Sequence, residues 1–183
     1  MARRLHIVRH GQSTFNAAYA ESGEDPMYFD APLSPLGQRQ VAARRTEWAD
    51  FEPDLVVVTP FTRAIQTALG IFGGRGLPFL VDARHREMLG ASCDVGRSPQ
   101  VLATEFPDLD FSHLDDPWWY APPGGADPFE IEPHAHVSAR VDAFRSWILG
   151  RPEQTIVAVG HATFFMELSG HVMANCEMMQ LDL

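Results

Sequence analysis

The stretch LHIVRHG, residues 5–11, passes from a short apolar run directly into a cluster of reactive groups. Residues 5–8 are typical of a short buried strand. A guanidinium, an imidazole and a glycine follow it as Arg9, His10 and Gly11. In open α/β sheets, ligands bind beyond the carboxyl ends of the strands. The stretch therefore predicts a strand that delivers anion-binding and nucleophilic groups to such an edge.

Three further stretches repeat this arrangement of an apolar run followed by a charged or ionisable group. They are LVVVT (55–59) before TPFTRAIQTA with Arg63, LPFLV (77–81) before HREMLG with Glu87, and TIVAV (155–159) before GHATFF with His161. Each run is rich in apolar or β-branched residues and predicts a buried strand. Because the carboxyl ends of parallel strands share one edge, we expect these side chains to converge with Arg9 and His10.

Helical patterns separate the predicted strands. Ser34-Pro35 is typical of a helix start, and that helix is expected to run to about Trp48. Three other sets of apolar residues have helical spacing: Ile65, Ala68, Leu69 and Phe72; Val137, Val141, Phe144 and Ile148; and Phe164, Phe165, Leu168 and Val172. Strands that alternate with helices predict an α/β fold, a three-layer α/β/α sandwich with a largely parallel central sheet.

Length and composition favour one domain over residues 1–183. Hydrophobic residues make up 45% of the 183 residues, which is enough for a substantial core. No apolar run approaches the roughly 18 residues of a membrane span, and the first run is too short for a signal peptide. With only two cysteines, Cys93 and Cys176, we expect a reduced, cytoplasmic protein.

The charged residues exclude several functions. The chain has 24 acidic and 14 basic residues, a net charge of −10, and every basic residue is arginine. Without lysine, Schiff-base chemistry and a P-loop are excluded. A net negative chain without a basic run is also a poor nucleic-acid binder.

The four motifs, in this order, resemble those of the histidine phosphatase superfamily, which includes the phosphoglycerate mutases. The resemblance covers residues 5 to about 170, and LSPLGQRQ at 33–40 adds to it. It implies that His10 becomes phosphorylated, that Arg9, Asn16 and Arg63 bind the phosphate, and that His161 donates a hydrogen bond to the transferring group. It also implies that neither a metal nor a cofactor is required.

The chemistry of phosphoryl transfer explains these residue types. Guanidinium groups match phosphate oxygens, and two of them beside His10 are expected to lower its pKa and keep the imidazole nucleophilic. A departing alkoxide needs a proton, and Glu87 fits as the general acid. The loop after Glu87 departs from the family pattern, because Gly90 follows after three residues rather than four. Asp94 therefore remains an alternative acid.

Other candidate residues have simpler interpretations. His134 and His136 have a spacing seen in metal sites, but we expect two solvated histidines. Cys93 has no paired histidine motif, so a nucleophilic role is not expected. The cluster Trp118-Trp119-Tyr120 is interpreted chiefly as packing that holds a loop.

Residues 88–133 match the family least and are expected to form an irregular cap or loop. Within them, residues 98–133 hold seven prolines, eight acidic residues and no arginine, which predicts a negative potential over the site. Residues 98–139 contain no lysine or arginine that could hold the second anionic group of a mutase substrate. We therefore favour a phosphatase for small phosphomonoesters over a mutase. A non-catalytic phosphate-binding homologue is the other alternative. No nucleic-acid or membrane partner is expected, and the sequence does not indicate an oligomeric state.

Overall fold

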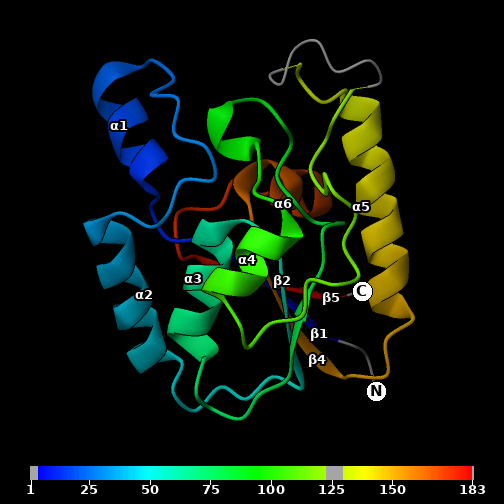
Figure 1. The fold of residues 1–183 in the computed structure, drawn as a ribbon. Coiled ribbons are helices and arrows are strands. Elements are labelled where there is room, and N and C mark those ends of the chain that lie inside the picture. The colour runs from blue at the N-terminus through cyan, green and yellow to red at the C-terminus, as the bar shows by residue number, and fades with distance from the viewer. Residues whose placement is uncertain (1–3, 123–129, 183) are drawn as a thin grey trace.

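The computed structural model describes residues 4–122 and 130–182, and a five-stranded sheet lies at its centre (Figure 1). The strand order is β3-β2-β4-β1-β5. The strands are β1 (Arg4–Arg9), β2 (Leu55–Val58), β3 (Phe79–Val81), β4 (Thr155–Gly160) and β5 (Met178–Asp182). The first four are parallel to one another, and β5 pairs with β1 in the antiparallel direction.

Helices cover both faces of this sheet, because alternate strand residues point to opposite sides. Val56 and Val58 face a core shared with α2 (Pro35–Glu47), α3 (Thr62–Phe72) and α4 (Pro99–Glu105). Leu55 and Val57 face a second core shared with α5 (His134–Leu149) and α6 (Ala162–Ser169). In Figure 1, α2 and α3 lie on one side and α5 on the other. The predicted three-layer sandwich with a largely parallel sheet is confirmed.

The register of the strands brings their carboxyl ends to one edge. Arg9 of β1 is level with Gly160 of β4, and Val58 of β2 is level with both Val159 and Val81. The residues that follow these positions therefore emerge side by side.

Among the described residues, no helix is both long enough and apolar enough to cross a bilayer.

Several elements differ from the sequence predictions. The third strand begins at Phe79, although the carbonyl of Pro78 already accepts a hydrogen bond from Val56 N at 3.0 Å. The last helix ends at Ser169, because Gly170 adopts a left-handed conformation with φ of 75°. Val172 consequently lies outside the helix and is 71% exposed.

Four elements were not predicted at all: α1 (Thr14–Ser22), a short 3-10 helix (Ser92–Asp94), α4 and β5. Helix α1 has little apolar periodicity and begins at a capping box formed by Ser13 and Asn16. Helix α4 lies within residues 88–133, so that segment is not wholly irregular.

Helix α2 approaches the loop after β1 through a glycine. Ser34 N donates to the carbonyl of Gln12 at 2.8 Å, and Gly37 packs against the same peptide. A Cβ atom on Gly37 would lie 2.0 Å from Gln12 O, well inside van der Waals contact. The absence of a side chain at Gly37 thus lets α2 support the loop that follows His10.

We expect Gly37→Ala to lower the free energy of unfolding by about 1–3 kcal/mol, because the added methyl must displace a backbone carbonyl. Denaturant unfolding measures the change. Gln38→Ala, at an exposed position of the same helix, is the control and should stay within about 0.5 kcal/mol of the parent. Equal stability of the two variants would contradict the close approach.

Candidate active site

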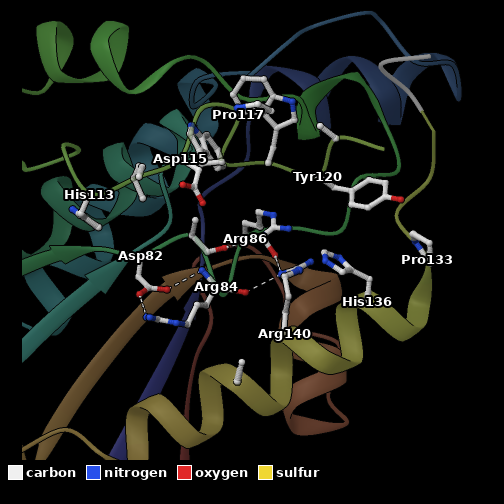
Figure 2. A pocket seen from close by; sticks show the side chains of 16 residues that line it. Asp82, Arg84, Arg86, His113, Asp115, Pro117, Tyr120, Pro133, His136 and Arg140 are labelled. Carbon is white, nitrogen blue, oxygen red and sulfur yellow. Dashed lines mark hydrogen bonds and ion pairs between the residues drawn. The ribbon is translucent and has the colours of Figure 1, made fainter. Parts of the chain in front are cut away.

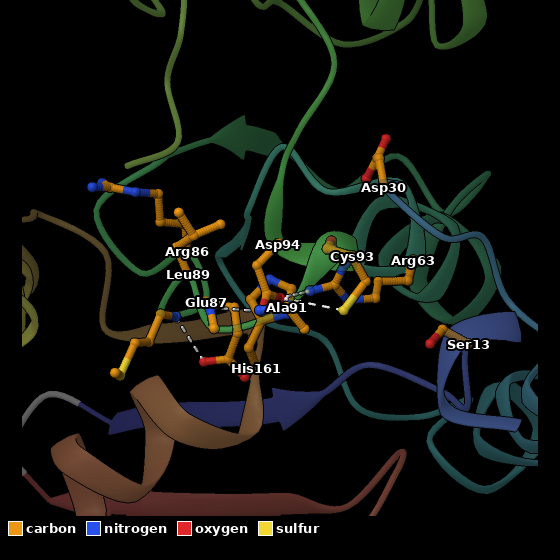
Figure 3. A network of polar contacts seen from close by, with 12 residues as sticks. Ser13, Asp30, Arg63, Arg86, Glu87, Leu89, Ala91, Cys93, Asp94 and His161 are labelled. Carbon is orange, nitrogen blue, oxygen red and sulfur yellow. Dashed lines mark hydrogen bonds and ion pairs between the residues drawn. The ribbon is translucent and has the colours of Figure 1, made fainter. Parts of the chain in front are cut away.

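Four ionisable side chains from different elements meet beyond the carboxyl edge of the sheet. His10 follows β1, Arg63 lies in the first turn of α3, Glu87 follows β3, and His161 follows β4. His10, Arg63 and His161 are buried, and Glu87 is partly buried. Figure 3 shows Glu87 beside His161, with Arg63 across the network. The sequence prediction that these groups converge is thus matched by their placement.

The His10 ring is held in one tautomer. Its Nδ1 atom lies 2.7 Å from the carbonyl oxygen of Gly11. A carbonyl can only accept, so Nδ1 carries the hydrogen and the lone pair of the neutral ring is on Nε2. Burial lowers the pKa of His10 well below its usual value, and the charges of Arg63 and Arg9 add to this shift. His10 is therefore a neutral imidazole whose Nε2 atom carries a lone pair.

Backbone contacts from distant segments fix the position of His10. Its N–H donates to Gly160 O at 3.0 Å, and its carbonyl accepts from Asn175 Nδ2 at 2.9 Å. The neighbouring Gly11 N–H donates to the hydroxyl of Thr67 in α3 at 3.0 Å. The loop that carries His10 is thus anchored to β4, to α3 and to the segment before β5.

His161 is fully buried, and its ring centroid lies 5.2 Å from that of His10. Its Nε2 atom is 2.7 Å from Thr59 Oγ1. Its Nδ1 atom has no partner among the described residues. Burial lowers the pKa of His161 well below its usual value, and Arg63 and His10 contribute. Sequence reasoning missed Thr59, although it is the last residue of the LVVVT run and so lies at the same edge.

The two guanidinium groups are held differently. Arg63 donates from Nη1 to Cys93 O at 2.7 Å and forms an ion pair through Nη2 with Asp94 at 3.0 Å. Arg9 donates from Nη1 to Met173 O at 2.7 Å, and its buried Nε has no partner among the described residues. Burial lowers the pKa of Arg9, with Glu87 opposing the shift and Arg63 adding to it.

The start of α3, and with it Arg63, is positioned by a buried network that the sequence did not reveal. Asp30 accepts from Thr62 N at 2.8 Å and from Arg97 Nε at 2.8 Å. The N-cap position of α3, Phe61, has no side-chain cap, so Asp30 supplies the acceptor from another segment. The Arg63 guanidinium also lies over the Phe61 ring, 4.4 Å from its centroid.

The two candidate acids occupy different surroundings. Glu87 accepts from Thr163 N at 3.1 Å and Phe164 N at 3.2 Å, at the N-terminus of α6 just beyond His161. Asp94 is bound to Arg63, and its second oxygen accepts from the N–H groups of residues 90 and 91. Burial raises the pKa of Asp94 to about 6, with Arg63 opposing and Glu87 adding to the shift. Both carboxyl groups belong to the site.

This arrangement of a neutral histidine, two guanidinium groups and two carboxyl groups can be compared with known families. The model of the histidine phosphatase superfamily (branch 1) matches residues 5–181. The chain belongs to this superfamily.

Relatives in this superfamily are similar over most of the chain. A phosphoglycerate mutase-like protein of Arabidopsis thaliana is 32% identical over 95% of this chain and 76% of its own length. The glucosyl-3-phosphoglycerate phosphatase of Mycolicibacterium vanbaalenii is 28% identical over 91% of this chain and 72% of its own length.

Solved structures show the same fold. A mycobacterial glucosyl-3-phosphoglycerate phosphatase, solved with VO3, has a TM-score of 0.65 and 25% identity, covering 99% of this chain and 91% of that chain. An Escherichia coli protein described as an alpha-ribazole-5'-P phosphatase has a TM-score of 0.71 and 22% identity, covering 100% of this chain and 91% of that chain. The second likeness concerns the fold alone.

Asn16 lies in the first turn of α1, where it forms a capping box with Ser13. Its Oδ1 atom accepts from Ser13 N, and its own N–H donates to Ser13 Oγ, both at 3.1 Å. The described contacts tie Asn16 to the start of α1 rather than to His10 or Arg63. Its capping bond uses Oδ1, which leaves the amide nitrogen as a donor, and phosphate binding by Asn16 stays a prediction.

His134, His136 and Cys93, the other candidates from the sequence, each contact an acidic side chain. His134 lies 2.8 Å from Glu167, whereas His136 contacts Glu132, so the two histidines engage different carboxylates. Burial strongly raises the pKa of the Cys93 thiol, with Asp94 adding to the shift, which keeps the thiol protonated.

Residues 98–133 contact the site through Trp118. This side chain is buried, packs on Phe61 with ring centroids 4.7 Å apart, and donates to Arg97 O at 2.8 Å. Trp118 is thus a packing residue, and Phe61 in turn contacts the His161 ring at 5.0 Å.

The expectation that the acids of residues 98–133 are unbalanced is wrong for two of them. Glu105 pairs with Arg97 at 2.6 Å, and the buried Glu132 pairs with Arg140 at 2.8 Å. Arginines outside the segment supply the cations that it lacks. Asp127, which the prediction also included, lies outside the described residues.

Proposed function

We propose that this protein is a phosphatase that hydrolyses small phosphomonoesters through a phosphohistidine on His10. The observation that carries the proposal is the buried, neutral His10 ring, whose Nε2 lone pair lies in the field of Arg9 and Arg63. Guanidinium groups bind phosphate oxygens and stabilise the charge that develops during transfer. The phosphatases among the relatives support this assignment.

The first step joins Nε2 of His10 to phosphorus while the bond from phosphorus to the leaving oxygen breaks. His161 donates from Nδ1 to a phosphoryl oxygen, since this nitrogen has no other partner among the described residues and Nε2 can accept from Thr59. The leaving oxygen takes a proton from Glu87, whose carboxyl group lies at the start of α6, just beyond His161. We assign the proton to Glu87 because Asp94 is engaged with Arg63.

In the second step, water attacks phosphohistidine and Glu87 accepts a proton from that water. The N–P bond breaks, His10 regains its lone pair, and inorganic phosphate leaves. The N–H groups at the start of α6 that contact Glu87 stabilise the ionised carboxylate between the two steps.

The proposal is tested with p-nitrophenyl phosphate, from which we expect release of inorganic phosphate, and with 3-phosphoglycerate, from which we expect no 2-phosphoglycerate. Rapid quenching with ³²P-labelled ester should trap an acid-labile phosphoenzyme. Phosphate binding without turnover would instead indicate a non-catalytic homologue. Formation of the 2-isomer as fast as phosphate release would indicate a mutase.

We expect treatment with EDTA to leave the rate of p-nitrophenyl phosphate hydrolysis unchanged. Arg9 and Arg63 supply the positive charge that a metal ion provides in other phosphatases. The rate is measured after dialysis against EDTA and again after addition of Mg²⁺ or Zn²⁺. Loss of activity on chelation, with recovery on adding a divalent cation, would contradict this mechanism.

We expect Thr59→Val to lower kcat by about tenfold or more, a loss of about 1.4 kcal/mol of transition-state stabilisation. Valine keeps the shape of threonine but removes the hydroxyl that orients the His161 ring. Steady-state kinetics measures the change. Thr104→Val, at an exposed position of α4, is the matched control. An unchanged kcat in Thr59→Val would show that the contact has no catalytic part.

A further inference from the structure

One cavity of the protein is lined by Arg86, the residue that precedes Glu87 in the chain (Figure 2). Its volume is about 760 Å³. Its walls are the residues after β3, the face of α5 that carries His136, Arg140 and Ala143, and part of residues 113–121. None of His10, Arg63, Glu87 and His161 lines it. Whatever occupies this cavity therefore binds separately from the phosphate under attack.

Three arginines line this cavity, and two of them are engaged by the protein. Arg84 pairs with Asp82. Arg140 donates to Glu132 from Nε at 2.9 Å and from Nη2 at 2.8 Å. Its Nη1 atom donates to the carbonyls of residues 84 and 86, both at 2.9 Å. Arg140 is thus a structural cation.

Arg86 is different, because its side chain is only 12% exposed and yet has few partners. Its Nη1 donates to Ala83 O at 3.1 Å, and its Nη2 lies 3.6 Å from Glu132. Its buried Nε has no partner among the described residues. Burial lowers the pKa of Arg86 to about 10, and the charge of Arg140 adds to this shift. A guanidinium has five N–H donors, so Arg86 has more donors than the described residues provide acceptors for.

The nearby acids do not compensate for Arg86. Glu132 is fully buried and is shared among Arg86, Arg140 and His136. Figure 2 shows Arg86, Arg140 and His136 grouped toward one end, whereas Asp82, His113 and Asp115 lie toward the other. Among the residues that the structure describes, Glu132 is thus the one carboxylate that pairs with both Arg86 and Arg140.

We infer that the Arg86 end of this cavity binds the anionic oxygen group, a phosphate or a carboxylate, of a small molecule. Guanidinium groups bind both anions through paired N–H donors. Trp119 and Tyr120 line the same cavity and offer apolar surface to the rest of the molecule. This site goes beyond the proposed function, because hydrolysis at His10 does not require it.

Calorimetric titration with inorganic phosphate tests the inference, and the expected stoichiometry is two phosphates per chain. Ala143 lines the cavity from an exposed position on α5, so Ala143→Glu should place a carboxylate there without disturbing the core. We expect this variant to weaken one site at least tenfold. Ala143→Gln, which has the same shape without the charge, should keep both sites.

Arg63→Gln separates the two sites, because it should remove the phosphate at the catalytic centre and leave the one near Arg86. Circular dichroism confirms that each variant is folded. A site that survives in Arg63→Gln and is lost in Ala143→Glu supports the inference even if the protein hydrolyses no ester. Binding that is lost in Arg63→Gln and unchanged in Ala143→Glu overturns it.

A parallel titration with acetate identifies the anionic group. Binding of acetate that Ala143→Glu weakens assigns a carboxylate to the site, and binding of phosphate alone assigns a phosphate. If neither anion binds at a site sensitive to Ala143→Glu, the inference is wrong.

Discussion

His10→Ala is expected to lower kcat for p-nitrophenyl phosphate by about a thousandfold or more, as removal of a covalent nucleophile does in other enzymes. The proposed route depends on the single lone pair of Nε2, which the contact between Nδ1 and Gly11 O makes available. Alanine leaves phosphate-binding groups but no atom that can attack. The phosphoenzyme trapped by rapid quenching should disappear together with turnover.

The control for this experiment is His171→Ala, because His171 is exposed and contacts Glu177 at the surface. It should retain the parent kcat. Thermal unfolding of both variants shows whether the fold survives. If folded His10→Ala kept a tenth of the parent activity, a covalent mechanism through this histidine would be untenable.

Arg63→Gln is expected to lower kcat/KM by about 10²–10³-fold, the effect of removing a preorganised group that stabilises transition-state charge. Arg63 is buried, and its orientation is fixed by Cys93 O and Asp94. It therefore needs no rearrangement to meet the charge that develops on the phosphoryl oxygens. Glutamine retains polar atoms but loses the positive charge and the planar fork.

Two further variants separate catalysis from folding in this test. Arg63→Gln leaves Asp94 buried without its cation, which costs stability. Adding Asp94→Asn removes that charge, so the double variant should regain stability in denaturant unfolding but not activity. Arg39→Gln, at an exposed position of α2, controls for the change in net charge. Recovery of activity in the double variant would show that Arg63 acts only through the fold.

Local sequence patterns predicted most of the sheet and the edge where the site forms. The apolar runs at 55–59 and 155–159 are buried on both faces, and such strands show in sequence as continuous β-branched stretches. Because these strands are parallel, the residue that follows each of them lies at the same edge of the sheet. The order of strands and motifs along the chain was therefore enough to group His10, Arg63, Glu87 and His161 at one edge.

Contacts between distant segments could not be predicted from local sequence patterns. Asp30 and Arg97 meet at the start of α3 from segments 67 residues apart, and no local pattern marks that pairing. The partners of Glu132 also come from other elements. Counting charges within residues 98–133 alone therefore overestimated the unpaired negative charge of this segment. Strand β5, MMQLD, has neither clean alternation nor a β-branched run.

The bonds between the start and the end of the chain have a consequence for biosynthesis. Arg9 N donates to Glu177 O, the Arg9 carbonyl accepts from Cys176 N, and Asn175 supports His10. At roughly 5–20 residues per second, a ribosome needs about 10–35 s to pass from residue 10 to this segment. The segment that supports His10 is therefore made long after His10 itself. A nascent chain cannot hold His10 in its final position until residues 175–177 have left the exit tunnel.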